Sequence, residues 1–233
     1  MGQAVLWGVV AASPLFVGAL LALWRVWPPP WLGLVLGFGA GALVSSIAFD
    51  LWEDGVELAG PIPLVAGLAI GALCYYAADR FVERRAAASG GQGAPLALGA
   101  LLDGIPEQLV LGIGLASGDG IGVALVIAII VSNLPESIGS SADLLSGGAR
   151  KTRVLALWAG VTVICALATV GGYALADAVS AEVRAGVSGF AAGALLVMLV
   201  DSMIPDAQQK AKDSTGLATV LGFAVAAGLS LAG

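Results

Sequence analysis

The sequence predicts an all-α polytopic membrane protein with eight transmembrane helices in a single domain, residues 1–233. Composition is the first observation: 59% of the 233 residues are apolar, 11% are charged, and the mean hydropathy is +0.98. A soluble domain usually carries about 25% charged residues. The other two observations are the spacing of the charges along the chain and the distribution of the basic residues between its loops.

Five spans are predicted from uncharged runs, each long enough to cross about 30 Å of hydrocarbon as a helix. In chain order these runs are 1–24, 26–49, 58–78, 154–176 and 214–233. Three more segments have the same length and apolar background but carry acids. They are 95–117 with Asp103 and Glu107, 121–145 with Glu136, and 185–207 with Asp201. Eight spans leave only short loops, so any activity must lie within the bilayer.

The basic residues support the count of eight. Eight spans place nine of the ten basic residues on one side of the membrane: Arg25, Arg80, Arg84, Arg85, Arg150, Lys151, Arg153, Lys210 and Lys212, against Arg184 alone on the other. Cytoplasmic loops carry an excess of Lys and Arg, which places both termini outside, across a plasma membrane of prokaryotic type. No basic patch for nucleic acid is left. Lipid is the expected surrounding partner, and a homodimer is one open alternative for the assembly.

Acids inside the spans are the main functional signal. Each ionisable side chain near the bilayer centre costs about 2.5 to 3.5 kcal/mol, so something must compensate it. Asp103 and Glu107 are four residues apart and leave the same face of a helix. Pro106 is expected to kink that helix and to free the carbonyl of Leu102. Two carboxylates and a free carbonyl form an oxygen-lined site that divalent cations accept.

The next span repeats this arrangement. SNLPES at 132–137 matches DGIPEQ at 103–108 with a constant offset of 29, which aligns Pro135 with Pro106. Ser132, Asn133 and Glu136 therefore join the candidate metal ligands. A pair of proline-interrupted spans with polar groups at matching positions is typical of a transport site near the membrane midplane.

A second repeat surrounds the first. GFGAGAL at 37–43 matches GFAAGAL at 189–195 with an offset of 152. Because their spans run in opposite directions, we expect an inverted repeat, with spans 1–3 and 6–8 flanking the central proline-broken pair 4–5. Acids near these motifs and at the end of span 5 are candidates for a transport pathway, with a solvated rim as the alternative: Asp50, Glu53, Asp54, Asp143, Asp201 and Asp206.

These motifs resemble the ZIP (Zrt/Irt-like protein) family of divalent metal transporters. DGIPEQ and SNLPES stand where that family has H-N-x-P-E-G and H-x-x-P-E-G, and the likeness covers essentially the whole chain. It implies eight helices, outer termini, and one metal site of Asp103, Glu107, Asn133 and Glu136 with Ser132. It also implies that one helix bundle moves against another, like an elevator.

The chain departs from the family in having no histidine, so it looks like a histidine-free, prokaryotic-type member. An all-oxygen site suits Mn²⁺ and Fe²⁺ as well as Zn²⁺, and the resemblance favours Zn²⁺. The metal is then a transported substrate that moves toward the cytoplasm, and no prosthetic group is expected. Gly104 stands in place of the family's asparagine, and Gln108 and Ser137 stand in place of its glycines.

Two other functions have to be compared with metal transport. A proton-linked secondary transporter of a non-metal substrate would use the same carboxylates. An intramembrane aspartyl protease would need a GxGD motif, but ASGD at 116–119 has alanine at its first position. Without histidine, the usual serine hydrolase and zincin arrangements are excluded. We therefore expect a transporter and not an enzyme.

Overall fold

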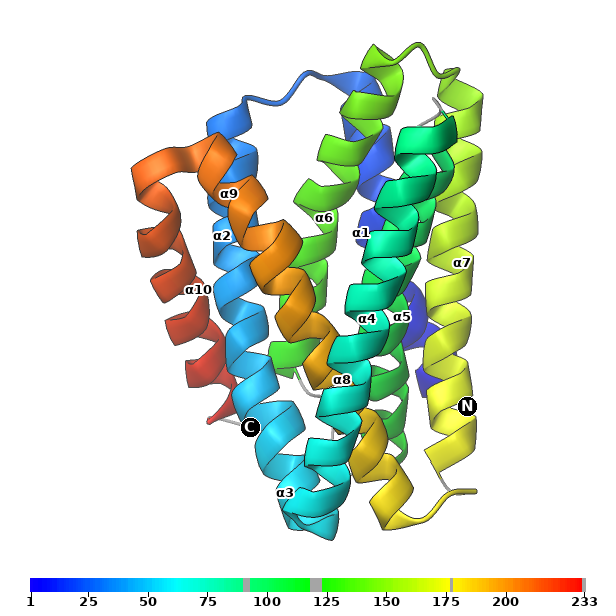
Figure 1. Ribbon diagram of the computed structural model, residues 1–233, viewed down its shortest axis with the longest axis vertical. Coiled ribbons are helices and arrows are strands. Elements are labelled where there is room, and N and C mark those ends of the chain that lie inside the picture. The colour runs from blue at the N-terminus through cyan, green and yellow to red at the C-terminus, as the bar shows by residue number, and fades with distance from the viewer. Residues whose placement is uncertain (90–92, 118–122, 177, 232–233) are drawn as a thin grey trace.

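The computed structural model describes the chain except residues 90–92, 118–122, 177 and 232–233, and it leaves a few further side chains undescribed, among them that of Asp103. All regular elements of the described chain are helical and form one bundle (Figure 1). The elements are α1 (Gly2–Trp24), α2 (Pro29–Ser46), η1 (Ile47–Glu53), α3 (Asp54–Ala59), α4 (Pro61–Ser89), α5 (Gly93–Ser117), α6 (Val123–Ser146), α7 (Lys151–Ala176), α8 (Ala181–Met198), η2 (Leu199–Met203), α9 (Ile204–Ala211), η3 (Lys212–Ser214) and α10 (Thr215–Ser230).

The all-helical prediction is confirmed. Six segments of the described chain are long and apolar enough to cross a membrane: Gly2–Trp24, Pro29–Ala59, Pro61–Val82, Leu125–Ser146, Lys151–Ala176 and Ala181–Ser230. The last segment folds back on itself, because Lys212 has a backbone φ of 53° and η3 reverses the chain between α9 and α10 (Figure 1). Gly104–Ala116 is a shorter apolar helix.

The two ends of the bundle differ in charge. The loops that join α1 to α2, α6 to α7 and α9 to α10 lie together at the top of Figure 1, and both termini lie toward the bottom. Those loops carry basic residues, including Arg25, Arg150 and Lys212. We call these the basic end and the terminal end of the bundle.

Pro106 lies inside α5 and Pro135 inside α6, and both helices continue through their prolines, so neither proline ends its helix. The kinks expected at these two positions stay a prediction. A proline removes one backbone hydrogen bond, and the bonds on either side hold the helix together when neighbouring helices pack against it.

The helical irregularities occur instead in two π-helical segments. These are η1, which continues α2, and η2, which continues α8. Their first residues, Ile47 and Leu199, are 152 positions apart, which is the offset of the two GFxAGAL motifs. π-Helical turns are rare and are often found at functional sites.

The densest helix contacts fall within two groups, which also meet where α2 packs against α6. α5 packs along α7, and α1 packs against both α6 and α7. In the other group α4 pairs with α8, and α2 pairs with α10. Glycines allow the close approach: a Cβ added at Gly193 of α8 would lie 2.0 Å from the carbonyl oxygen of Leu68 in α4. Small residues at helix interfaces are typical of membrane bundles.

Candidate functional site

The polar face of α6 lies against the other helix group. Ser132 and Asn133 are each 2% exposed, and Glu136 is partly buried. A Cβ added at Gly39 of α2 would lie 3.1 Å from Cα of Ser132 and 3.0 Å from Cε of Met203 in η2. Because Glu136 is four residues after Ser132, it lies on the same face of α6, toward α2 and η2.

On α5 the buried carboxylate lies on a face of its own. Glu107 is 1% exposed. The side of α5 that meets α7 carries Gly104, Gln108 and Gly112, which lie at helical spacing from one another. A separation of 100° per residue turns Glu107 away from the centre of that contact. Glu107 is therefore buried on α5 to one side of the line of residues that meets α7.

The predicted ligands are only partly placed. Glu107, Ser132, Asn133 and Glu136 lie on two helices inside one bundle, while the side chain of Asp103 lies outside the described residues. Among the described His, Cys, Asp and Glu side chains, no three are grouped closely enough to hold a metal ion. Any site therefore depends on the undescribed Asp103 or on neutral oxygen donors.

Asn133 is a neutral donor that needs a partner. Its Nδ2 atom is buried and has no hydrogen-bond partner among the described atoms. Leaving a buried polar group unsatisfied costs about 1 to 3 kcal/mol. The nitrogen and oxygen of an amide are assigned from their surroundings, so the same position can present Oδ1. A cation there would satisfy the side chain. The hydroxyl of Ser132 already donates to the carbonyl of Ile129, at 3.1 Å, and keeps its lone pairs.

Gln108 and Ser137 fix the two central helices to their neighbours, a role that sequence reasoning missed. The hydroxyl of Thr169 in α7 donates to Oε1 of Gln108, at 2.5 Å. The hydroxyl of Ser137 lies 3.2 Å from the carbonyl of Pro14 in α1 and 2.8 Å from that of Asn133. Gln108 and Ser137 are themselves 29 positions apart, and that offset was the available signal.

Polar residues that follow Glu136 along α6 lie on more than one side of the helix. Ser137 faces α1, and Ser141 is fully buried one turn later. Gly139 lies beside Lys210 of α9, and Asp143 is exposed. The side of α6 that carries Gly139 is therefore the one that meets a basic residue of α9.

A cluster of buried apolar side chains lies between the acids and the terminal end of the bundle. Leu43, Leu111, Ile129 and Leu195 come from four helices and belong to one buried cluster. From the course of the chain, Leu111 lies on the terminal-end side of Glu107, and Ile129 on the terminal-end side of Glu136. Buried apolar side chains therefore lie on the terminal-end side of both acids.

The acids near the terminal end of α2 are mostly exposed. Glu53 and Asp54 are exposed, whereas Asp50 in η1 is partly buried. Ser230 of α10 donates a hydrogen bond to Oδ1 of Asp50, at 2.6 Å. This bond joins the π-helical segment to the end of the last helix.

The acids expected toward the basic end have different surroundings. Asp201 in η2 and Asp143 in α6 are exposed. Asp206 of α9 forms an ion pair with Lys210, one turn later in the same helix. Its charge is therefore already compensated by the protein.

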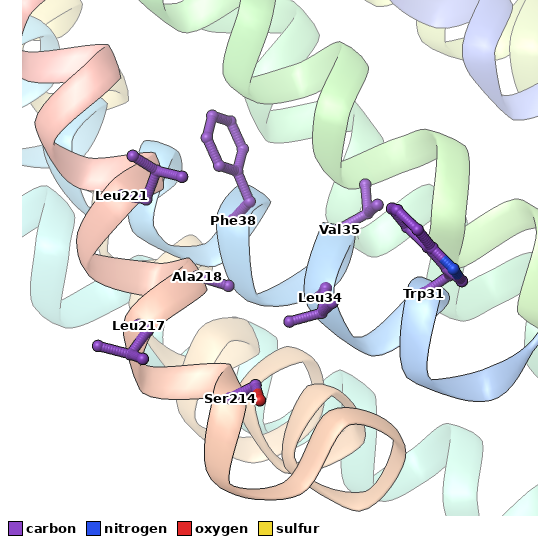
Figure 2. Close-up of a pocket in the computed structure, with 8 residues that line it drawn as sticks. All are labelled: Trp31, Leu34, Val35, Phe38, Ser214, Leu217, Ala218 and Leu221. Carbon is purple, nitrogen blue, oxygen red and sulfur yellow. The ribbon is translucent and has the colours of Figure 1, made fainter.

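A separate apolar groove of about 500 Å³ lies between α2 and α10 (Figure 2). Trp31, Phe38 and Leu217 are among its lining residues, and Ser214 lies at one end. No acid lines it. The groove is therefore distinct from the carboxylate faces of α5 and α6.

Gly104 illustrates how closely α5 meets α7. A Cβ at position 104 would lie 2.6 Å from Sγ of Cys165. We expect Gly104→Ala to lower the free energy of unfolding by about 1 to 3 kcal/mol, the usual cost of overpacking. Cys165→Ala in the same chain should recover most of that loss, as a double-mutant cycle of melting temperatures would measure. Equal losses with and without Cys165 would contradict this packing.

Comparison with known proteins gives one informative likeness. The chain matches no family model. It is similar to a protein of Arabidopsis thaliana that is named as a candidate zinc transporter, with 29% identity over 197 residues. The match covers 80% of this chain and 31% of the relative, so the chain spans about a third of that protein's length.

Proposed function

We propose that this chain transports a divalent metal ion, with Zn²⁺ as the first choice and Mn²⁺ or Fe²⁺ as alternatives. Glu107 carries the proposal, because an ionisable side chain that is 1% exposed inside an apolar bundle is costly and marks a functional site. No Lys or Arg occurs from residue 86 to 149, a range that includes α5 and α6. The similarity to a plant protein named as a zinc transporter supports a metal in that role.

The proposed ligands are Asp103 and Glu107 of α5, with Asn133, Glu136 and Ser132 of α6. All of them offer oxygen, which suits hard and borderline divalent ions. The unsatisfied amide of Asn133 supports its place in the set. Coordination without imidazole or thiolate is weaker for zinc, which favours release of a transported ion. Protons compete for carboxylate ligands, so transport should weaken in acid.

We further propose eight membrane crossings and an inverted repeat. The packing supports this repeat. The repeat relates α1 to α7, α2 to α8, α4 to α10 and α5 to α6. When each helix is exchanged with its counterpart, every principal pair of packed helices corresponds to an observed pair. For example, α2 with α10 becomes α8 with α4, and α1 with α6 becomes α7 with α5. The matching positions of η1 and η2 give independent support.

Orientation follows from charge. We propose that the basic end faces the cytoplasm of a prokaryotic cell, that the termini face outward, and that the metal moves inward. Asp50, Glu53 and Asp54 then lie toward the outer approach, and Asp143, Asp201 and Asp206 toward the inner one. α1, α5, α6 and α7 would move together against α2, α4, α8 and α10, and the two packing groups support that division.

The test is uptake of Zn²⁺, Mn²⁺, Fe²⁺ and Cd²⁺ into proteoliposomes that contain the full chain. We expect flux of at least one metal, and a loss of about tenfold or more in Asp103→Ala and in Glu136→Ala, as for lost charged ligands. Asp213→Ala, which removes an exposed acid from η3, is the matched control and should retain wild-type flux. Absence of metal flux under every condition would favour the proton-linked transporter.

A further inference from the structure

We propose that Lys210 is a tethered cation on the basic-end side of the metal site, where its ammonium group weakens metal binding and favours release in that direction. The inference rests on the proposed function, because it assigns one more charged group to the same site. It concerns a residue that the sequence patterns had placed only among the basic loop residues.

The ammonium group of Lys210 lies beside the carboxylate-bearing helix. A Cβ added at Gly139 of α6 would lie 3.9 Å from Nζ of Lys210, which is the nearest described atom beyond the adjoining turns of α6. Gly139 is three residues after Glu136, which places both on neighbouring positions of one helix face, about 4.5 Å apart along the axis. Since α6 runs toward the basic end, Lys210 lies on that side of Glu136.

The stem of Lys210 is confined by backbone contacts. A Cβ added at Gly33 of α2 would lie 2.7 Å from Cβ of Lys210 and 2.6 Å from the nitrogen of Ala211. The hydroxyl of Thr215 donates to the carbonyl of Ala207 at 3.1 Å and ties α9 to α10. The backbone at Lys210 therefore lies close against α2, and its ammonium group lies near both Asp206 and α6.

The ion pair with Asp206 controls how strongly this charge acts. The side chain of Lys210 is 23% exposed, so its charge is only partly screened by solvent. Asp206 holds the ammonium group on α9 and offsets part of its charge. A divalent ion at Glu136 is repelled by what remains. We expect this repulsion to change metal affinity by about tenfold, because charges several ångströms apart interact appreciably near a protein surface.

The simpler reading is a local ion pair that only stabilises the end of α9. Lysine near a helix C-terminus, four residues after an acid, has that effect, worth a few tenths of a kcal/mol. Such a pair would influence helix stability and leave metal affinity unchanged. Affinity therefore separates the two readings.

The experiment measures Zn²⁺ and Cd²⁺ affinity of the full chain in detergent by titration calorimetry. Lys210→Met keeps the apolar stem and removes the charge, and we expect it to bind metal about tenfold more tightly. Lys210→Arg keeps the charge and should bind within about twofold of wild type. Lys212→Met, which removes an exposed charge two residues away, is the matched control and should also stay within about twofold.

Asp206→Asn tests the tether. Removing its charge frees the ammonium group, so we expect metal binding to weaken by about threefold. In the double variant Asp206→Asn/Lys210→Met both charges of the pair are gone, so the local net charge and the metal affinity should return to within about threefold of wild type. A double variant that binds as weakly as Asp206→Asn alone would make Asp206 a metal ligand and would overturn the inference. Unchanged affinity in Lys210→Met would overturn it equally.

Glu136→Gln separates this inference from the proposed function. If wild type binds metal and Glu136→Gln does not, the metal site stands whatever Lys210→Met does. If wild type binds neither metal, the proposed function fails and the role of Lys210 fails with it.

Discussion

Glu107→Gln is expected to remove nearly all of the stabilisation by metal that the proposed site predicts. A ligand present at a hundred times its dissociation constant stabilises the folded state by about 2.7 kcal/mol. Glu107 is 1% exposed. When its carboxylate becomes an amide, no exposed acid can take over its place without a rearrangement of the bundle. We expect metal affinity to fall by about a hundredfold or more, the upper part of the range for lost ligands and their supports. Melting curves with and without Zn²⁺ measure it.

Glu57→Gln is the matched control for this prediction. The substitution is chemically identical, but Glu57 is an exposed residue of α3 near the terminal end. Its metal-dependent shift should equal that of wild type. An equal loss in both variants would indicate a diffuse attraction of cations to acidic residues, and it would contradict a site built on the two central helices.

Gly193→Ala is expected to have the largest effect on stability. The added Cβ would lie 2.0 Å from the carbonyl oxygen of Leu68, which belongs to a backbone and cannot rotate away. α4 and α8 would have to separate along the most extensive helix interface of the bundle. We expect a loss of about 3 kcal/mol, which corresponds to a fall of about 6 to 12 °C in melting temperature for a chain of this length.

Gly160→Ala makes the same change in open space. Gly160 lies in α7 with no atom within 4 Å of the added Cβ. Alanine also has the higher helix propensity, so this variant should be as stable as wild type or slightly more stable. If Gly160→Ala proved as damaging as Gly193→Ala, close approach of α4 and α8 could not be the reason that glycine is needed at position 193.

Much of the fold could be predicted because burial in lipid imposes simple rules on the sequence. Uncharged runs marked the helices, since every backbone polar group must be satisfied within its own segment. The prolines alone do not decide whether a helix ends. Neighbouring helices pack against α5 and α6, which continue through Pro106 and Pro135, and that support comes from other parts of the chain.

The candidate site, like the fold, could be predicted from the sequence only in part. The offset of 29 identified Glu107 and Glu136 as related positions, because equivalent helices repeat equivalent polar groups. It did not reveal that Gln108 bonds to Thr169, or that Ser137 faces Pro14. These partners are 61 and 123 residues away, and no local pattern in α5 or α6 specifies them.

The sequence by itself determined that this chain is a bundle of apolar helices with acids at matching positions of two of them. Hydropathy and helical periodicity are properties of single segments, and they can be read without knowing what each segment touches. Only the tertiary structure decided where the π-helical segments lie, which side chains bond across helices, and that Lys210 lies beside Gly139. Those features depend on distances between helices, which are set when glycine faces meet across the bundle.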